Sequence, residues 1–328
     1  MIKTSILDID QIKILPYIDC DNLNNRIVPI LPYYDGTKWQ IFIYNNDEII
    51  PLEGQPSEGD YFASKPEKDS DIYFDFLNFI VQRAFWPNVG QAIDSLRNDL
   101  HNLGASLGKF QLFYEVSSEK KLEVTRFVAS ELEYIFIVCR SIFDLLQKVI
   151  SQMWDKIEFV DKNINKRQIP ESFRKMILSS NKLMDVGTIT NKFKIPPLLA
   201  EFYYRHASFF FMLREYRDNI THRGLDFKSI FNTEKGFAIN KDKEPFSTFK
   251  IWNKEHLLPN NLASLRPVIA YLIIHTIEAC EDFSATIQKI IVFPPDIAPN
   301  SKLFIRGYHN KELIKLDKIL NDCLWWDE

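Results

Sequence analysis

The hydrophobic pattern of the chain changes near residue 72. Before that point, short runs of aromatic and β-branched residues, NRIVPILPYY and KWQIFIYN, flank the turn residues DGT. Such runs are typical of short strands and hairpins. Residues 53–71, EGQPSEGDYFASKPEKDSD, are rich in proline, serine, glycine and charge, and this composition indicates a linker or exposed loop. We therefore predict a small β-rich region over residues 1–72.

From residue 73 the apolar residues recur at helical spacing. DFLNFIVQRAF and VGQAIDSLRNDLHNLGASLGKFQLF each predict a helix. A longer helix is predicted over residues 119–157, where apolar positions alternate in steps of four and three along one seam: Val128, Leu132, Ile135, Cys139, Ile142, Leu146, Val149 and Met153. A seam of this length predicts a helix that packs against partner helices.

A second long helix is predicted to begin at KIPPLLAEF and to end near His222 or Arg223, because Gly224 is a natural C′ residue. SIFNTEKGFAI predicts a short β-hairpin, and residues 262–291 predict a last long helix that Pro294 and Pro295 stop. We therefore expect a mainly α fold. It consists of an antiparallel helical bundle over residues 73–295 with a short β-hairpin insertion, and a tail over residues 296–328 that ends in an exposed tryptophan pair.

Composition narrows the possible functions. The 328 residues carry a net charge of −4, which excludes binding of nucleic acid by bulk positive charge. The four cysteines form no C-x-x-C pair, and no phosphate-binding glycine motif or set of metal-ligating residues occurs. We expect no cofactor and no metal. The unpaired cysteines indicate reduced thiols, so we expect a cytoplasmic protein. The most apolar stretch, PVIAYLIIHTIEA, is too short to span a bilayer, so we expect no membrane partner.

Candidate chemistry is concentrated in the stretch LREYRDNITHRGLDF. Histidine exchanges protons near neutral pH, and arginine offers a fixed fork of donors to phosphate oxygens, so Arg217 and His222 suit cleavage of a phosphodiester bond without a metal. Asp218 could orient the imidazole. The remaining polar residues of the stretch are expected to contact the substrate, namely Arg214, Asn219 and Arg223.

A structural explanation of the same residues is also open. Arg214 and Asp218 are spaced as a surface ion pair, and His222 and Arg223 could simply complement the dipole at the C-terminal end of the helix. His206, on the apolar seam, is expected to be a satisfied core or interface histidine. Arg140 and Asp144 are expected to form an intrahelical ion pair.

The spacing of Arg217 and His222 raises a geometric question. Residues five apart on a regular helix point about 140° away from each other. One helix therefore cannot easily direct both side chains at one phosphate. Either the helix unwinds near Gly224, or two copies of the stretch meet across a dimer axis.

REYRDNITHRG resembles the R-x(4–6)-H motif of the HEPN superfamily, whose members are helical bundles. Asp218 occupies the polar position that often follows the arginine in that family. CRSIFDLL, with Arg140 and Asp144, is also similar to bacterial HEPN sequences, and the resemblance covers residues 73–295. It implies a metal-independent endoribonuclease that acts as a homodimer on RNA in a toxin–antitoxin or anti-phage defence system, with an antitoxin or defence partner. The alternative is a non-catalytic HEPN-like module that dimerises or binds a nucleotide or a protein partner.

Overall fold

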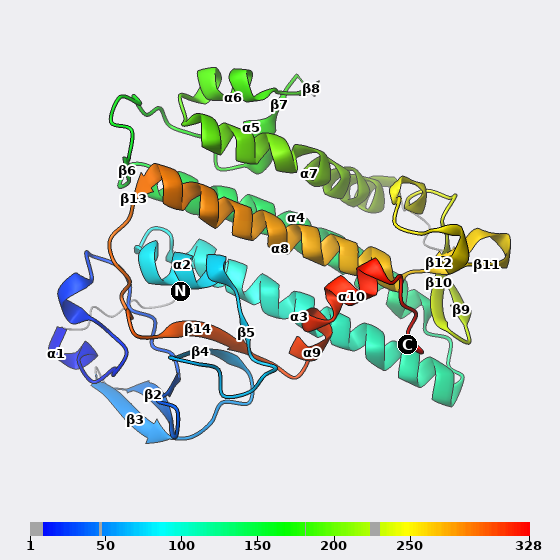
Figure 1. The fold of residues 1–328 in the computed structure, drawn as a ribbon, viewed down its shortest axis with the longest axis horizontal. Coiled ribbons are helices and arrows are strands. Elements are labelled where there is room, and N and C mark those ends of the chain that lie inside the picture. The colour runs from blue at the N-terminus through cyan, green and yellow to red at the C-terminus, as the bar shows by residue number, and fades with distance from the viewer. Residues whose placement is uncertain (1–8, 46–47, 181, 224–229) are drawn as a thin grey trace.

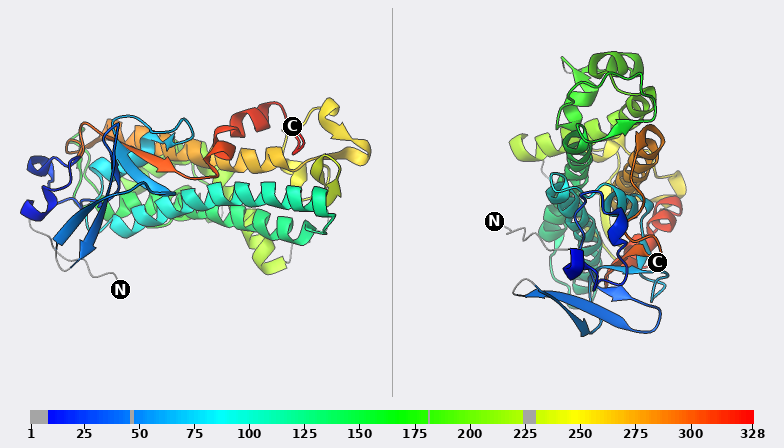
Figure 2. Two further views of the ribbon diagram at one scale, coloured as in Figure 1. Left: turned by 90° about the horizontal axis from the view of Figure 1, so that it is seen from below. Right: turned by 90° about the vertical axis from the view of Figure 1, so that its left-hand side faces the viewer.

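The computed structural model describes residues 9–45, 48–180, 182–223 and 230–328, and of residues 217–223 it describes the backbone only. Long helices lie side by side along the molecule, and a mixed sheet lies at one side of them (Figure 1, Figure 2). The long helices are α3 (Gly90–Lys120), α4 (Thr125–Met153), α7 (Pro197–Arg223) and α8 (Arg266–Ile290). The shorter helices are α1 (Ile9–Ile12), α2 (Asp75–Arg83), α5 (Phe173–Ile177), α6 (Val186–Phe193), α9 (Asn310–Ile314) and α10 (Leu316–Asn321).

Helix α4 is the centre of the helical layer, because it contacts α3, α7 and α8. The predicted seam explains this position, since all eight of its apolar residues are buried. Helix α7 runs antiparallel to α4: the Tyr203 hydroxyl donates to Oε1 of Gln147 near one end, and the rings of Tyr216 and Phe136 lie 5.0 Å apart near the other.

A six-stranded sheet lies on the side of α2 and α8 that faces away from α7 (Figure 1). Its order is β3-β2-β1-β4-β14-β5, and only the pair β1 and β4 is parallel. The strands are β1 (Tyr33–Tyr34), β2 (Trp39–Asn45), β3 (Glu48–Glu53), β4 (Gly59–Ala63), β5 (Ile72–Tyr73) and β14 (Lys302–Arg306). Strand β14 comes from the tail and pairs with β4 on one side and β5 on the other, so the N-terminal region and the tail share one sheet.

The inner strands of this sheet are buried on both faces. Phe62 and Ile305 face the helices and belong to the main core, whereas Tyr61 and Phe304 form a second cluster with Trp39 on the outer face. Burial on both faces removes the alternation of apolar and polar residues that identifies a strand in a sequence.

The prediction of a mainly α fold is therefore wrong. About 51% of the chain is helical and 16% is in strands, and the molecule combines helices with a six-stranded mixed sheet and smaller sheets. The error has a physical origin. Strand β4 lies within residues 53–71, which were predicted as a linker because Gly, Pro and Ser flank it. Strand β14 lies in the tail, where no strand was predicted.

The predicted hairpin insertion is part of a larger sheet. Its strands pair antiparallel, and two further strands extend them in the order β11-β12-β10-β9. These strands are β9 (Ile230–Thr233), β10 (Gly236–Asn240), β11 (Leu257–Leu258) and β12 (Leu262–Ser264). The remaining described strands form two small two-stranded sheets. One consists of β6 (Glu158–Phe159) and β13 (Ile291–Val292), and the other consists of β7 (Leu178–Ser179) and β8 (Lys182–Leu183).

The end of the tail packs against this second sheet. The rings of Phe237 and Trp326 lie 5.1 Å apart, and Arg266 donates to the carbonyl oxygen of Trp325. A Cβ atom at Gly236 would lie 2.8 Å from the Trp326 ring, so only glycine allows this close approach. Trp325 and Trp326 are buried, and the expectation that they are exposed is wrong.

Candidate functional site

The Arg–His stretch lies on the last turns of α7, which extends to Arg223. The backbone is helical at the positions of Arg217, Asp218, Asn219, His222 and Arg223, whereas their side chains lie outside the described residues. Arg214 is half-buried one turn earlier. Because the helix does not end before Arg223, positions 217 and 222 stand about 140° apart around its axis.

Tyr216 fixes the orientation of α7 directly before Arg217. It is buried, and its hydroxyl donates to the carbonyl oxygen of Pro245 at 2.6 Å. Its ring stacks on Phe249 with an interplanar angle of 11° and a centroid distance of 6.2 Å. The ring of Phe136 of α4 lies 5.0 Å from the Tyr216 ring. These contacts fix the rotation of α7 about its axis next to Arg217, where the arginine–histidine motif begins.

His206 lies three turns before Arg217 on α7 and has partners on α8. Its Nε2 lies 2.8 Å from Oδ2 of Asp282, and Arg205 donates to both oxygens of the same carboxylate. Burial lowers the pKa of His206, and Asp282 opposes this effect only in part. The prediction of a satisfied core or interface histidine is confirmed, as is the Arg140–Asp144 pair, whose ion-pair distance is 2.9 Å.

A second cluster of polar residues connects α3 to the six-stranded sheet. Asp60 of β4 has a side chain that is only 2% exposed, and it accepts from Nε of Arg97 and from Nε2 of His101, the latter at 2.9 Å. Burial alone would raise the pKa of Asp60, but the hydrogen bonds and charges of His101 and Arg97 outweigh it and lower the pKa. Asp60 is thus an ionised carboxylate that orients His101.

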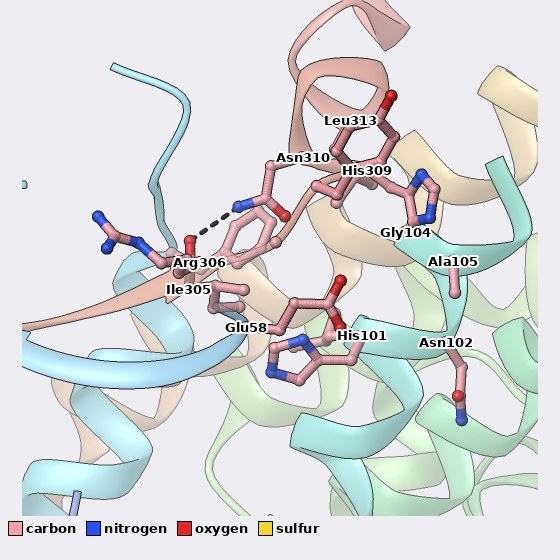
Figure 3. Close-up of a pocket in the computed structure, with 14 residues that line it drawn as sticks. Glu58, His101, Asn102, Gly104, Ala105, Ile305, Arg306, His309, Asn310 and Leu313 are labelled. Carbon is pink, nitrogen blue, oxygen red and sulfur yellow. Dashed lines mark hydrogen bonds between the residues drawn. The ribbon is translucent and has the colours of Figure 1, made fainter. Parts of the chain in front are cut away.

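His101 lines a pocket of about 230 Å³ between α3 and the segment that joins β14 to α9. Figure 3 shows Glu58 and His101 at one wall of this pocket and His309, Asn310 and Leu313 at the other. The lining also includes the apolar residues Phe74, Leu100, Gly104, Ala105 and Ile305.

Glycines on α3 allow the tail to lie this close to the helix. A Cβ atom at Gly108 would lie 2.0 Å from the His309 ring, and one at Gly104 would lie 3.3 Å from Leu313. Arg306 borders the pocket, but its guanidinium is held by Asp71 and Glu67. Its Nη1 is buried without a hydrogen-bond partner, and the group lies over the Trp39 ring.

Sequence reasoning missed this pocket. Asp60, His101 and His309 are far apart in the chain and share no motif spacing. The one available signal was the spacing of Asp94, Arg97 and His101 on α3, which places three polar side chains on one face of a helix. Only the pairing of β14 with β4 brings Asp60 and the tail to that face.

In the described part of the chain, no group of three or more His, Cys, Asp or Glu side chains is placed to hold a metal ion. Within the same residues, no helix is long and apolar enough to cross a membrane. Comparison of the chain with protein-family models, with curated proteins and with solved structures gives no match.

Proposed function

We propose that the protein is a metal-independent endoribonuclease whose reactive groups are Arg217 and His222 at the C-terminal end of α7. The observation that carries the proposal is the combination of these residue types on the last turns of a long helix, within the stretch that resembles the HEPN motif. The proposal rests on this motif and not on the fold class.

The chemistry assigns a separate role to each residue. His222 takes the proton from the ribose 2′-hydroxyl or delivers one to the leaving 5′-oxygen, and the helix C-terminus favours its charged form. Arg217 donates to the phosphate oxygens and stabilises the added negative charge of the transition state. Asp218 supports the imidazole. The expected products carry a 2′,3′-cyclic phosphate and a free 5′-hydroxyl.

The described backbone favours a site shared by two copies of the chain. Helix α7 continues through Arg223, and the alternative in which the helix unwinds near Gly224 concerns a residue outside the described part of the chain. Tyr216 fixes the rotation of the helix about its axis. On a regular helix, positions 217 and 222 point about 140° away from each other. Two helices that meet at a two-fold axis would supply an arginine from one copy and a histidine from the other.

The test is incubation of the purified protein with total RNA, with and without excess EDTA. We expect cleavage to persist in the chelator and the products to carry cyclic phosphate. Activity that disappears with EDTA and returns with Mg²⁺ or Mn²⁺ would overturn the mechanism. An active monomer in light scattering at the assay concentration would overturn the shared site. If the folded protein binds RNA without cleaving it, the non-catalytic module replaces this proposal.

A further inference from the structure

A hollow of about 440 Å³ lies at the N-terminal end of α7, between the loop at residues 161–167 and the junction of α6 with α7 (Figure 1). Two cations line it, Arg167 from the loop and Lys194 from the junction. Both residues are exposed, and neither side chain has a hydrogen bond or an ion pair within the described part of the chain. The hollow therefore offers two positive charges to a ligand.

Residues 155–194, which include this loop and junction, are the basic part of an acidic chain. They contain nine lysines and arginines against five aspartates and glutamates. Their net charge is +4 and that of the whole chain is −4, so the remaining residues together carry −8. The charge of the whole chain does not attract a polyanion, but a local basic surface of this kind does.

The backbone holds both cations in place. Nε1 of Trp154, beside the end of α4, donates to the carbonyl oxygen of Arg167 at 2.8 Å. The ammonium of Lys166 donates to the carbonyl oxygens of Trp154 and Ile157, which fixes the loop to the same helix end. Lys194 ends α6 in a left-handed conformation with φ of 53°. Because the backbone is already ordered at both positions, less conformational freedom is lost when a ligand binds.

The polar residues of the lining suit a sugar–phosphate backbone. Asn165, Thr190 and Asn191 add amide and hydroxyl groups, and such groups bond to phosphate and sugar oxygens in nucleic-acid complexes. Asp161 is the one acidic residue of the lining. Its carboxylate already accepts from the backbone N–H and the side-chain amide of Asn163.

The apolar residues of the lining favour RNA over a lipid surface. Lipid binding needs apolar side chains that protrude beside the cations. Within the lining, Ile195 is buried, Ile164 is half-buried and only Pro197 is exposed. Leu198, beside the lining, is also exposed, so lipid vesicles are included in the test below.

We propose that this hollow binds the sugar–phosphate backbone of RNA, with Arg167 and Lys194 each in contact with a phosphate group. The inference rests on the proposed ribonuclease function, because it gives the same substrate a second binding region. From Pro197, which lines the hollow, to position 217, helix α7 rises about 30 Å. A stacked strand covers this distance in about nine nucleotides at roughly 3.4 Å each. RNA of about 25 nucleotides therefore reaches both regions, whereas RNA of about five nucleotides reaches only one.

The experiment measures fluorescence anisotropy of labelled 2′-O-methyl RNA of about 25 nucleotides, which lacks the attacking hydroxyl and stays intact. Arg167→Gln/Lys194→Gln removes two phosphate contacts and should weaken binding about 10- to 100-fold at low salt. The slope of log affinity against log salt should become shallower by about 1.4, since each contact with a single strand contributes about 0.7.

The matched control is Lys65→Gln/Lys318→Gln, which removes the same charge at two exposed positions outside the hollow. It should bind RNA as the parent does. Equal melting temperatures of the two double variants show that both are folded. The inference is overturned if the parent protein does not bind this RNA, or if Arg167→Gln/Lys194→Gln retains the parent affinity. It is also overturned if vesicles of phosphatidylcholine and phosphatidylserine, and not RNA, bind in a way that depends on these two cations.

Cleavage kinetics distinguish this inference from the function on which it rests. For unmodified RNA of about 25 nucleotides, Arg167→Gln/Lys194→Gln should raise KM and leave kcat unchanged, because neither side chain touches the reacting phosphate. For RNA of about five nucleotides, cleavage should not change. If no RNA is cleaved but the double variant still loses affinity, the ribonuclease function fails and the binding site stands. If RNA is cleaved and the double variant keeps the parent affinity, the function stands and the binding site fails.

Discussion

The guanidinium of Arg306 lies 4.5 Å from the centre of the Trp39 ring, and this contact joins the tail to the outer face of the N-terminal strands. The same guanidinium donates to Asp71, whose side chain is 1% exposed. Removing one partner of a buried ion pair leaves the other charge without compensation in a medium of low dielectric constant. Substitution of Arg306 therefore tests how much the tail stabilises the sheet.

We expect Arg306→Met to lower the free energy of unfolding by about 3–5 kcal/mol, measured by urea denaturation followed by circular dichroism. The double variant Arg306→Met/Asp71→Asn should recover part of this loss, because it also removes the uncompensated charge. Lys38→Met is the control, since the pair of Lys38 and Glu53 is exposed and should contribute less than about 1 kcal/mol. Equal effects of Arg306→Met and Lys38→Met would contradict the assigned role.

Glu281 should make the stability depend on pH. It accepts from the backbone N–H of Phe76 at the start of α2, and burial raises its pKa from 4.5 to about 6. The folded protein therefore binds the proton more tightly than the unfolded chain, so the stabilisation is complete below pH 4.5 and is lost as the pH rises through about 6. Because the carboxyl is partly exposed and screened, we expect a loss of about 1 kcal/mol.

The Glu281→Gln variant should lack this loss, because glutamine keeps the acceptor and does not ionise. As the pH rises from 4.5 to above 6, the unfolding free energy of the parent protein should fall. The unfolding free energy of the Glu281→Gln variant should not show this fall. Glu119→Gln changes an exposed carboxylate at the end of α3 and should follow the parent curve. A Glu281→Gln curve parallel to that of the parent would show that this carboxyl does not couple to folding.

The proposed cleavage chemistry predicts a pattern among four variants. His222→Ala should lower the rate about 10²–10⁴-fold with nearly unchanged RNA affinity, because a proton-transfer group acts in the transition state. Arg217→Lys should also fail, since an ammonium lacks the planar fork of donors. Arg214→Ala should have a milder effect, because Arg214 lies one turn earlier.

His206→Gln is the control for this series, because His206 lies on the same helix and contacts Asp282. It should lower the melting temperature more than it lowers the cleavage rate of the folded fraction. If His222→Ala cleaves RNA at the parent rate while folded His206→Gln protein is inactive, the reactive residues have been assigned to the wrong part of α7.

Two glycines of α3 should respond differently to alanine. In a helix interior, alanine is favoured over glycine by about 1 kcal/mol. Gly104→Ala would place its Cβ atom 3.3 Å from Leu313, a tight but adjustable contact, so we expect a stability close to that of the parent. Gly108→Ala would place it 2.0 Å from the His309 ring, and we expect a net loss of about 1–3 kcal/mol from the clash. Thermal unfolding measures both, and equal melting temperatures would show that His309 moves away freely.

The long helices could be predicted from the sequence because each has one buried face. The seam from Val128 to Met153 follows the helical period, and every one of its residues is buried in α4. The hairpin of β9 and β10 was recognised from the turn residues between two apolar runs. In these elements local spacing alone carries the information.

The central strands could not be predicted, because long-range pairing determines them. GDYFA in β4 and KLFIR in β14 are short and buried on both faces, so neither alternates. The pocket beside His101 depends on the same pairing and on two glycines that admit the tail. The Arg–His stretch, by contrast, was found from sequence alone, and its role stays a prediction.

The position of β14 has a consequence for biosynthesis. Arg306 and Glu67 are bonded although 239 residues separate them, and β5 has β14 as its partner in the sheet. While the ribosome is still making the helices, β4 and β5 are already outside it but the strand that joins them does not yet exist. The nascent chain therefore exposes two unpaired strand edges until the tail emerges, and during this interval the edges are open to chaperones and to pairing with other chains.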